Sequence, residues 1–384
     1  MKIALLPSAY APSVGGVEVL THRLAVNLRG AGHEVEIWTG RSAGDHLSAD
    51  EQLDGLRVRR FVFAAPRMHP RGLAQWPLAA VHGYTALRRA AREFNPDVLH
   101  VQCFSANGAY ASALSRLTGV PLVVTLQGET VMDDNDIYEH SAFLQAALRA
   151  GLRHAAVVTG CSQFTLDDAT QRFGLNPGKA RVIFNGVDDD EVPAVPVELP
   201  FERYVLGLGR FVPKKGFDLL VDAFALLGAD AEALGLVLVG DGSARADVEA
   251  QVERLGLRDK VHFTGALGRG QVASVMAGAE TFVMASRVEP FGIVALEAWR
   301  AGTPVVVSSR GGAGEFVGAQ SGIVVDPFDT AALTGALLRL AREPATRQLL
   351  AQKGSRRVRD FSWSNLRRQY EAVYAEAAGP APSR

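Results

Sequence analysis

Short apolar runs alternate with helical patterns from one end of the chain to the other, and this alternation limits the possible folds most strongly. It is typical of parallel sheets, in which each strand is followed by a helix that covers it. In the first half, the runs expected as strands are 3–6, 34–38, 98–101, 122–125, 156–159 and 182–184. In the second half they are 204–208, 235–239, 261–263, 281–284 and 305–308. The pattern therefore predicts an α/β protein.

The length of 384 residues is too great for one ordinary hydrophobic core, so we expect two domains. Segment 192–200 contains three prolines and no helical period, and it is expected to link the domains. The predicted N-terminal domain covers 1–190 and the predicted C-terminal domain covers 201–362. Residues 363–378 predict a last helix, whose apolar face has to dock on one of the domains.

Composition excludes several classes of function. The formal net charge is −1, which does not suit a nucleic-acid-binding surface. Residues 1–7 form an expected strand that is too short for a signal peptide, and no apolar run reaches the roughly 18 residues of a membrane helix. Cys103 and Cys161 lie in apolar-rich surroundings and are expected to be reduced core residues. These features predict a cytoplasmic protein.

Glu289 and Glu297 stand eight residues apart around a segment that predicts a turn opening into a helix. Pro290 presets the turn, and Gly292 lets the backbone approach a ligand closely. Eight residues at helical rise span roughly 12 Å, so the two carboxylates can hold two hydroxyl-bearing parts of one elongated ligand. The free N–H groups at the helix start provide a seat for phosphate between them. Hydroxyls at both ends and phosphate in the middle describe a nucleotide sugar.

Two further segments supply groups for an anion. Gly15 and Gly16 lie between the first strand and the first helix, where backbone N–H groups can face a phosphate. Their spacing matches neither the dinucleotide fingerprint nor a Walker loop. Arg210 and Lys215 follow the first strand of the second half, at the edge where open α/β sheets bind ligands. Two cations at this edge suit a diphosphate.

Other strand ends carry weaker candidates, which ordinary turns also explain. Asp241, Gly242 and Thr264 lie where a base or a ribose could bind. Candidates for binding an acceptor are Glu129 with the acidic loop of Asp133 and Asp134, and Asn185 at the end of the first half. A solvated acidic loop is the simpler interpretation of Asp133 and Asp134.

These motifs, in this order and spacing, closely resemble those of the retaining family-4 glycosyltransferases over nearly the whole chain. The matching segments are 15–18, 32–35, 185–188, 209–210 with 215–216, 239–242, 289–292 with Glu297, 301–306 and 361–363. The resemblance implies the GT-B fold, in which two Rossmann-like domains with parallel sheets face each other across a cleft. It also implies that the acceptor docks mainly on the N-terminal domain and that the last helix packs back on that domain.

The resemblance further implies a role for each matched residue. Glu289 would hold hydroxyls of the donor sugar and Glu297 the ribose, while Arg210 and Lys215 neutralise the diphosphate. The implied donor-binding set is Gly15, Gly16, Gly209, Asp241, Gly242, Thr264, Phe291, Gly292, Ile293, Val294 and Glu297. Transfer would retain the anomeric configuration, with the donor's own phosphate helping to deprotonate the acceptor. It requires neither a metal nor a cofactor, because protein cations and helix N-termini stabilise the leaving group.

Gln127 departs from the family pattern. Many relatives have histidine there, and often a second histidine at the position of Gln102. In relatives the first position contacts the sugar partly through its backbone carbonyl, which Gln127 also has. We therefore expect Gln127 at the sugar site, together with Arg210, Lys215 and Glu289.

Two alternatives of other kinds stay open. One is a sugar-nucleotide epimerase of the same fold, and the other is a non-catalytic protein that binds sugar nucleotides. Residues 73–94 also predict a helix that either packs on its own domain or makes weak peripheral contact with a membrane. The sequence does not specify the base, the hexose, the acceptor or the oligomeric state.

Overall fold

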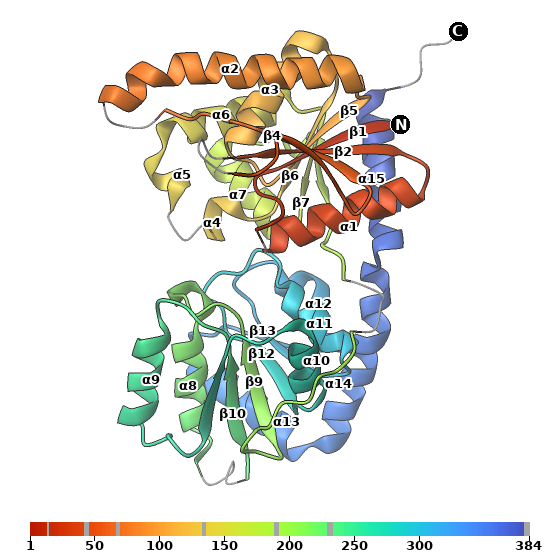
Figure 1. Ribbon diagram of the computed structural model, residues 1–384. Coiled ribbons are helices and arrows are strands. Elements are labelled where there is room, and N and C mark those ends of the chain that lie inside the picture. Colours follow the sequence, from red (N-terminus) through yellow and green to blue (C-terminus); the bar gives the residue numbers. More distant parts are fainter. Residues whose placement is uncertain are drawn as a thin grey trace. The chain divides into compact units, whose positions relative to one another are not determined.

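The chain forms two compact units, Met1–Asn185 with Trp363–Arg384 and Gly186–Ser362. The computed structural model describes residues 1–13, 15–41, 46–66, 70–132, 136–187, 192–228 and 233–379, without the side chains of 70–75. Each unit contains one sheet with helices on its faces (Figure 1). The boundary between the units follows Asn185, ahead of segment 192–200.

The N-terminal unit is built on a sheet of eight strands in the order β3-β4-β2-β1-β5-β6-β7-β8, all parallel except the edge pair β3 and β4. Its strands are β1 (Lys2–Pro7), β2 (Glu34–Gly40), β3 (Asp50–Leu53), β4 (Leu56–Phe61), β5 (Val98–Gln102), β6 (Leu122–Leu126), β7 (Val157–Gly160) and β8 (Ala180–Val182). Its helices are α1 (Gly16–Gly30), α2 (Pro70–Phe94), α3 (Ala106–Thr118), α4 (Glu129–Met132), α5 (Ile137–His140), α6 (Ala142–His154), α7 (Gln163–Phe173) and α15 (Trp363–Ala378).

Helix α15 is the last helix predicted from the sequence, and it packs within the N-terminal unit. Its apolar face, Leu366, Tyr370, Val373 and Tyr374, is buried, with Tyr374 fully so. The helix lies beside α1 and against strands β5 to β7 (Figure 1). The end of the chain therefore completes the core of the unit in which the chain begins.

The C-terminal unit has a fully parallel sheet in the order β11-β10-β9-β12-β13-β14. Its strands are β9 (Tyr204–Leu208), β10 (Gly235–Val239), β11 (Val261–Gly265), β12 (Thr281–Met284), β13 (Val305–Ser308) and β14 (Ile323–Val325). Its helices are α8 (Phe217–Ala225), α9 (Arg245–Arg254), α10 (Arg269–Ala277), α11 (Ile293–Arg300), α12 (Ala313–Ser321), α13 (Thr330–Arg342) and α14 (Pro344–Arg357).

The strand order of the C-terminal unit reverses between β9 and β12. The chain runs outward from β9 through β10 to β11, and β12 then pairs with the other side of β9. In open α/β sheets, ligands bind beyond the carboxyl ends of the strands at such a reversal. The segments that follow β9 and β12, residues 209–216 and 285–292, meet at this point.

Most predicted strands lie where the apolar runs place them. The strand predicted at 182–184 is present but begins two residues earlier, since β8 covers Ala180–Val182. Strands β3, β4 and β14 were missed. Segment 192–200 has neither helix nor strand, and Val195 N–H donates to the Gly270 carbonyl in α10 at 3.0 Å. The proline-rich segment therefore packs on the C-terminal unit along part of its length.

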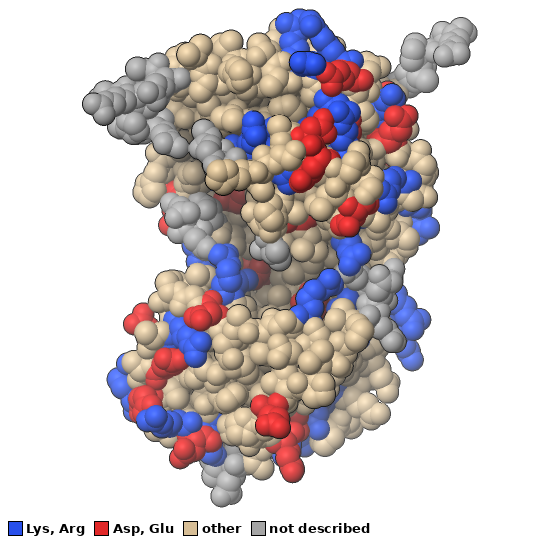
Figure 2. Space-filling model, in the orientation of Figure 1, with Lys and Arg blue, Asp and Glu red and all other residues tan. Residues whose placement is uncertain are grey.

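Helix α2 covers the predicted segment 73–94 and packs on its own unit. Leu87 on one face is fully buried, whereas Leu78 on the opposite face is 79% exposed. Among the described residues, no helix combines the length and the apolar character needed to cross a bilayer. Figure 2 shows lysine and arginine side chains interspersed with aspartate and glutamate over the visible face of both units.

Candidate active site

The turn predicted around Gly292 is present and begins α11. Gly292 has a φ of +90°, and a Cβ at this residue would come within 2.5 Å of Met284 Cε. The positive φ therefore favours glycine, whereas the end of the flexible Met284 side chain could move aside. Glu289 precedes the helix and Glu297 lies within it, as predicted.

Glu289 forms a direct ion pair with Lys215. The Lys215 ammonium donates to a carboxylate oxygen of Glu289 at 2.6 Å, and Ser286 Oγ lies 3.3 Å from the same oxygen. The Glu289 side chain is 8% exposed and that of Lys215 is 20% exposed. The sequence assigned these residues to different parts of the donor, whereas the structure brings them together at the strand-order reversal.

The Glu289 backbone is held from the β13 side. Its N–H donates to the Arg310 carbonyl at 3.1 Å, and its carbonyl accepts from Gly312 N–H at 2.8 Å. A Cβ at Gly311 would come within 1.9 Å of the Glu289 carbonyl oxygen. The glycines after β13 therefore fix the position of Glu289.

Arg287 and Asp218 join the two segments that meet at the reversal, and no sequence motif predicts this pair. Arg287 donates to both carboxylate oxygens of Asp218 and, at 2.7 Å, to the Pro213 carbonyl, while its own N–H donates to the Lys214 carbonyl. Burial raises the pKa of Asp218, but the hydrogen bonds with Arg287 outweigh burial and hold that pKa below its usual value. The residues around Lys215 are thereby tied to those around Glu289.

Glycines after β9 and β10 bring these strand ends close together. A Cβ at Gly240 would come within 1.9 Å of the Gly209 carbonyl oxygen, and a Cβ at Gly242 within 2.5 Å of the Phe211 carbonyl oxygen. The predicted donor residues Arg210 and Asp241 are exposed at this edge. Asp241 lies 3.5 Å from Arg245, the first residue of α9.

Other predicted donor residues have side chains that are buried, half-buried or hydrogen-bonded within the C-terminal unit. The Phe291 ring is 3% exposed and packs against Phe316 with 4.7 Å between centroids, so its side chain belongs to the core. Ile293 and Val294, in the first turn of α11, are half-buried. Thr264 Oγ1 donates to the Gly265 carbonyl at 2.8 Å.

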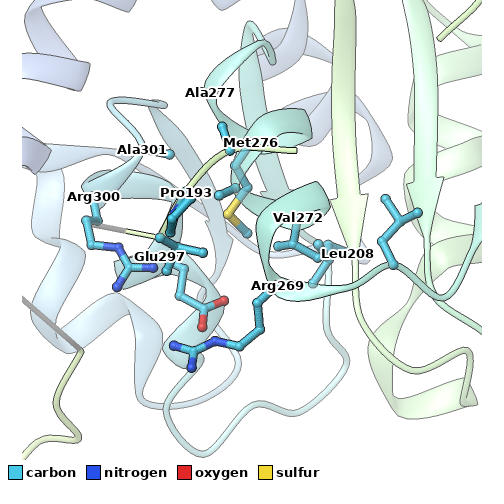
Figure 3. A pocket seen from close by; sticks show the side chains of 13 residues that line it. Pro193, Leu208, Arg269, Val272, Met276, Ala277, Glu297, Arg300 and Ala301 are labelled. Carbon is cyan, nitrogen blue, oxygen red and sulfur yellow. The ribbon is translucent and has the colours of Figure 1, made fainter. Parts of the chain in front are cut away.

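Glu297 borders a cavity of about 940 Å³ in the C-terminal unit. Apolar side chains of α10, among them Val272 and Met276, form one wall. In Figure 3, Glu297 and Arg269 extend toward the same space, and Arg300 follows Glu297 along α11. Sequence reasoning missed both arginines, although Arg269 opens the helix after β11 and Arg300 stands three residues after Glu297.

In the N-terminal unit, the Gln127 side chain is held by two other amides. Its Nε2 donates to Gln102 Oε1 at 3.2 Å, and its Oε1 accepts from Asn185 Nδ2 at 3.0 Å. Of the predicted acceptor residues, Asn185 thus contacts Gln127 directly. Asp133 and Asp134 lie outside the described residues.

Glu129 binds backbone N–H groups from two strand ends. One carboxylate oxygen accepts from Phe104 N–H at 2.5 Å and the other from Gln127 N–H at 2.7 Å. Burial raises the pKa of Glu129 to about 7, although these N–H groups and that of Gly128 act in the opposite direction. The carboxylate therefore joins the loop after β5 to the loop after β6.

Gly15 and Gly16 lie at the start of α1. Gly15 is the N-cap, with extended backbone, and Gly16 is the first helical residue. The space around Gly16 is open, because a Cβ there would meet no described atom within 4 Å. The first N–H groups of this 15-residue helix thus lie at the carboxyl edge of the N-terminal sheet.

The family described as "Glycosyltransferase Family 4" matches residues 14–191, and that described as "Glycosyl transferases group 1" matches residues 190–357. The 2-deoxystreptamine N-acetyl-D-glucosaminyltransferase of Streptomyces fradiae is 33% identical, over 84% of this chain and 82% of the relative. The chain belongs to glycosyltransferase family 4. The glycogen synthase of Mycobacterium tuberculosis is 29% identical to this transferase, over 98% of the chain and 95% of the relative.

The fold of the transferase is GT-B. HepE from Anabaena, solved in complex with UDP, superposes with a TM-score of 0.76 at 22% identity, over 97% of this chain and 99% of that chain. The prediction of two Rossmann-like domains with parallel sheets is therefore confirmed. Within the described ranges, no group of three or more His, Cys, Asp or Glu side chains converges in a way that could hold a metal ion.

Proposed function

We propose that this transferase moves a hexosyl unit from a UDP- or GDP-sugar to a hydroxyl of a small-molecule, lipid-linked or saccharide acceptor, with retention of configuration. The observation that carries the proposal is the Lys215–Glu289 pair, 2.6 Å apart where the strand order reverses. A cation beside a buried carboxylate, next to a helix start, offers groups for a phosphate and for sugar hydroxyls together.

In the proposed donor complex, the Lys215 ammonium interacts with the diphosphate as well as with Glu289. Arg210, exposed at the same edge, adds a second cation. Glu289 then accepts hydrogen bonds from sugar hydroxyls, which compensate for the weaker attraction to Lys215. The first N–H groups of α11 stabilise the charge that develops on the leaving phosphate.

The nucleoside of the donor is proposed to occupy the cavity beside Glu297. A carboxylate on its lining suits two ribose hydroxyls, and the α10 wall with Val272 offers an apolar surface to a base. HepE, a relative in fold, has been solved with UDP-glucose. This supports a nucleotide-sugar donor but does not select the base.

The proposed reaction takes place on one face of the sugar. The bond between the anomeric carbon and the phosphate oxygen breaks, and the acceptor oxygen bonds to that carbon from the same side. The acceptor proton passes to the leaving phosphate, so neither Glu289 nor Glu297 acts as nucleophile or general base. The protein cations and the helix N-terminus provide the charge stabilisation that a metal supplies in other transferases.

A donor screen tests this proposal first. UDP-, GDP- and ADP-sugars are added to the purified full chain, and the melting temperature is measured, since a ligand that binds only the folded state raises it. Nucleotide release is then followed with the stabilising donor. Glu289→Gln is expected to reduce release at least a hundredfold, a typical loss when a group that acts in the transition state is removed.

Glu253→Gln is the matched control, because it removes an exposed carboxylate on α9 and should leave release unchanged. The enzymatic proposal fails if Glu289→Gln and the unaltered protein release nucleotide at the same rate with every donor. An epimerase would instead return the donor with an isomerised sugar in the absence of acceptor. Retention is read from the anomeric configuration of the product, and metal independence from activity in excess EDTA.

A further inference from the structure

A continuous chain of hydrogen bonds runs through the N-terminal unit from Asn185 to α15. Asn185 binds Gln127, Gln127 binds Gln102, and Gln102 Nε2 lies 3.2 Å from His100 Nε2. His100 Nδ1 lies 2.7 Å from the Tyr374 hydroxyl. His100 is fully buried and Gln102 is 2% exposed, so water does not compete for these bonds.

The neighbours of the His100 ring define its tautomer. Burial lowers the pKa of His100 to about 3, so the ring is neutral and carries one N–H. Gln102 presents an NH₂ group, which only donates, to Nε2. Nε2 is therefore the acceptor and Nδ1–H donates to Tyr374. The hydroxyl of Thr125, 2.6 Å from Nε2, can rotate to donate or to accept and therefore fits either tautomer.

The side-chain amides of Asn185, Gln127 and Gln102 all point the same way along this chain of hydrogen bonds, because each donates to the next group toward His100. Turning one amide over would place two NH₂ groups, or two oxygens, against each other. Turning Asn185, Gln127 and Gln102 over together, with the proton moved to the other nitrogen of His100, satisfies every bond again. The orientation of Gln127 and the tautomer of His100 are therefore coupled, although these two residues share no hydrogen bond.

We propose that Gln102, His100 and Tyr374 are positioning residues that determine which atom of the Gln127 amide faces the sugar. In the observed orientation, the Gln127 amide uses one N–H and one oxygen lone pair in the hydrogen-bond chain. Its second N–H and second lone pair remain, and a sugar hydroxyl can satisfy both. The proposal rests on the proposed function and on the sugar contact that the family resemblance implies for Gln127. It gives α15 a role in specificity, since Tyr374, the last group of the hydrogen-bond chain, lies on that helix.

The Tyr370 hydroxyl also reaches this network. Burial raises the pKa of Tyr370, and hydrogen bonds with Thr125, Gln102 and Thr159 partly oppose that rise. Because hydroxyls both donate and accept, Tyr370 and the threonines fit either sense of the chain. The amides and the imidazole alone carry the directional information.

The first test measures the His100 tautomer from its ring ¹⁵N chemical shifts and needs no activity. The unaltered protein should show the Nδ1–H tautomer. Gln127→Glu puts an acceptor-only carboxylate in the chain, so Gln102 has to turn its NH₂ group toward it and its oxygen toward His100. The His100 proton should then move to Nε2. Gln171→Glu, which adds the same charge on an exposed face of α7, should leave the tautomer unchanged.

The coupling is refuted if the unaltered protein shows the Nε2–H tautomer, or if Gln127→Glu leaves the proton on Nδ1. Either result would mean that the amides adopt their senses independently. These readings do not depend on whether the protein transfers sugar, so they stand apart from the proposed function.

The second test is a double-mutant cycle on kcat/KM for sugar transfer. Tyr374→Phe removes the acceptor of Nδ1–H and favours the reversed chain, so kcat/KM should fall about tenfold, the value of one hydrogen bond. In a Gln127→Ala background, Tyr374→Phe should cause no further loss. Equal losses in both backgrounds would show that Tyr374 acts only through the packing of α15, and would overturn the positioning role.

Tyr110→Phe is the control for hydroxyl removal. Its hydroxyl donates to the Ala64 carbonyl in the same unit, outside the chain. If Gln127→Ala alone leaves kcat/KM unchanged, the proposed sugar contact fails and the positioning role fails with it. The tautomer measurement would then still decide whether the residues are coupled.

Discussion

Lys215 and Glu289, 74 residues apart in sequence, form a hydrogen-bonded ion pair of 2.6 Å at the point where the strand order of the C-terminal unit reverses. Both side chains are largely buried, so each charge depends on the other for compensation. Removing one partner from such a pair costs more than removing both, because the single variant leaves a buried charge without a partner.

Lys215→Met is therefore expected to destabilise the transferase by ~3 kcal/mol. Lys215→Met/Glu289→Gln should recover most of that loss, since it removes both charges. Nucleotide release should be abolished in both variants. Melting temperature and release are measured on the same samples. A double variant that melts no higher than the single one would contradict charge compensation as the role of the pair.

Arg287 tests whether the segment that carries Lys215 has to be held in place. Arg287→Lys keeps the charge but removes the two-pronged hydrogen bonding to Asp218 and the bond to the Pro213 carbonyl. We expect kcat/KM for the donor to fall about tenfold, with a stability loss of ~1 kcal/mol.

Arg310→Lys is the matched control for Arg287→Lys. Arg310 also donates two hydrogen bonds of 2.7 Å to an aspartate, Asp326, but both side chains are more than 40% exposed. Exposed pairs contribute little to stability, so this variant should behave like the unaltered protein. Equal effects of the two substitutions would show that the Asp218 contact has no special role in holding Lys215.

The main sheet strands and the turn before α11 follow from the sequence because apolar spacing and glycine act locally. Strand β4 does not, since Arg59 and Arg60 within it are buried. Their charges are matched by Glu36 and Glu51 from neighbouring strands, at 3.0 and 2.5 Å. An apolar-run criterion cannot recognise a strand whose buried charges are compensated by residues elsewhere in the chain.

Contacts between residues far apart in the chain also limit what the sequence shows of the candidate site. Glu289, Glu297 and Lys215 are identified by motifs, but the pairing of Lys215 with Glu289 depends on which strands become neighbours. The Arg287–Asp218 contact likewise joins segments far apart in the chain. A single sequence identifies the chemical groups, and the sheet topology determines which of them meet.

The raised pKa of Glu129 predicts that its contribution to the stability of the folded state falls as pH rises. Burial raises its pKa from 4.5 to about 7 in the folded chain, so between these values the folded state holds a proton that the unfolded state has released. Its contribution to stability is complete below pH 4.5 and is lost as pH rises through 7.

Glu129→Gln removes this titration. It also breaks one of the two hydrogen bonds to backbone N–H groups, because an NH₂ group cannot accept, so the variant should be less stable than the unaltered protein at low pH. The deficit should shrink by about 3 kcal/mol as pH rises from the acid to the alkaline side of the shifted pKa. Urea midpoints of both proteins across that range measure the difference. A deficit that is constant with pH would mean that the pKa of Glu129 is not raised.

The cavity beside Glu297 can be closed without changing any charge. Ala273 lies on its α10 wall, and Ala273→Trp places an indole in the space proposed for the nucleoside. The Lys215–Glu289 pair is left intact, so the protein should fold but lose the thermal stabilisation given by its nucleotide. Ala332→Trp, on an exposed face of α13, adds the same side chain and should keep that stabilisation. If Ala273→Trp still gains as much melting temperature from the nucleotide as the control, the nucleoside binds elsewhere and the assignment of Glu297 to the ribose is wrong.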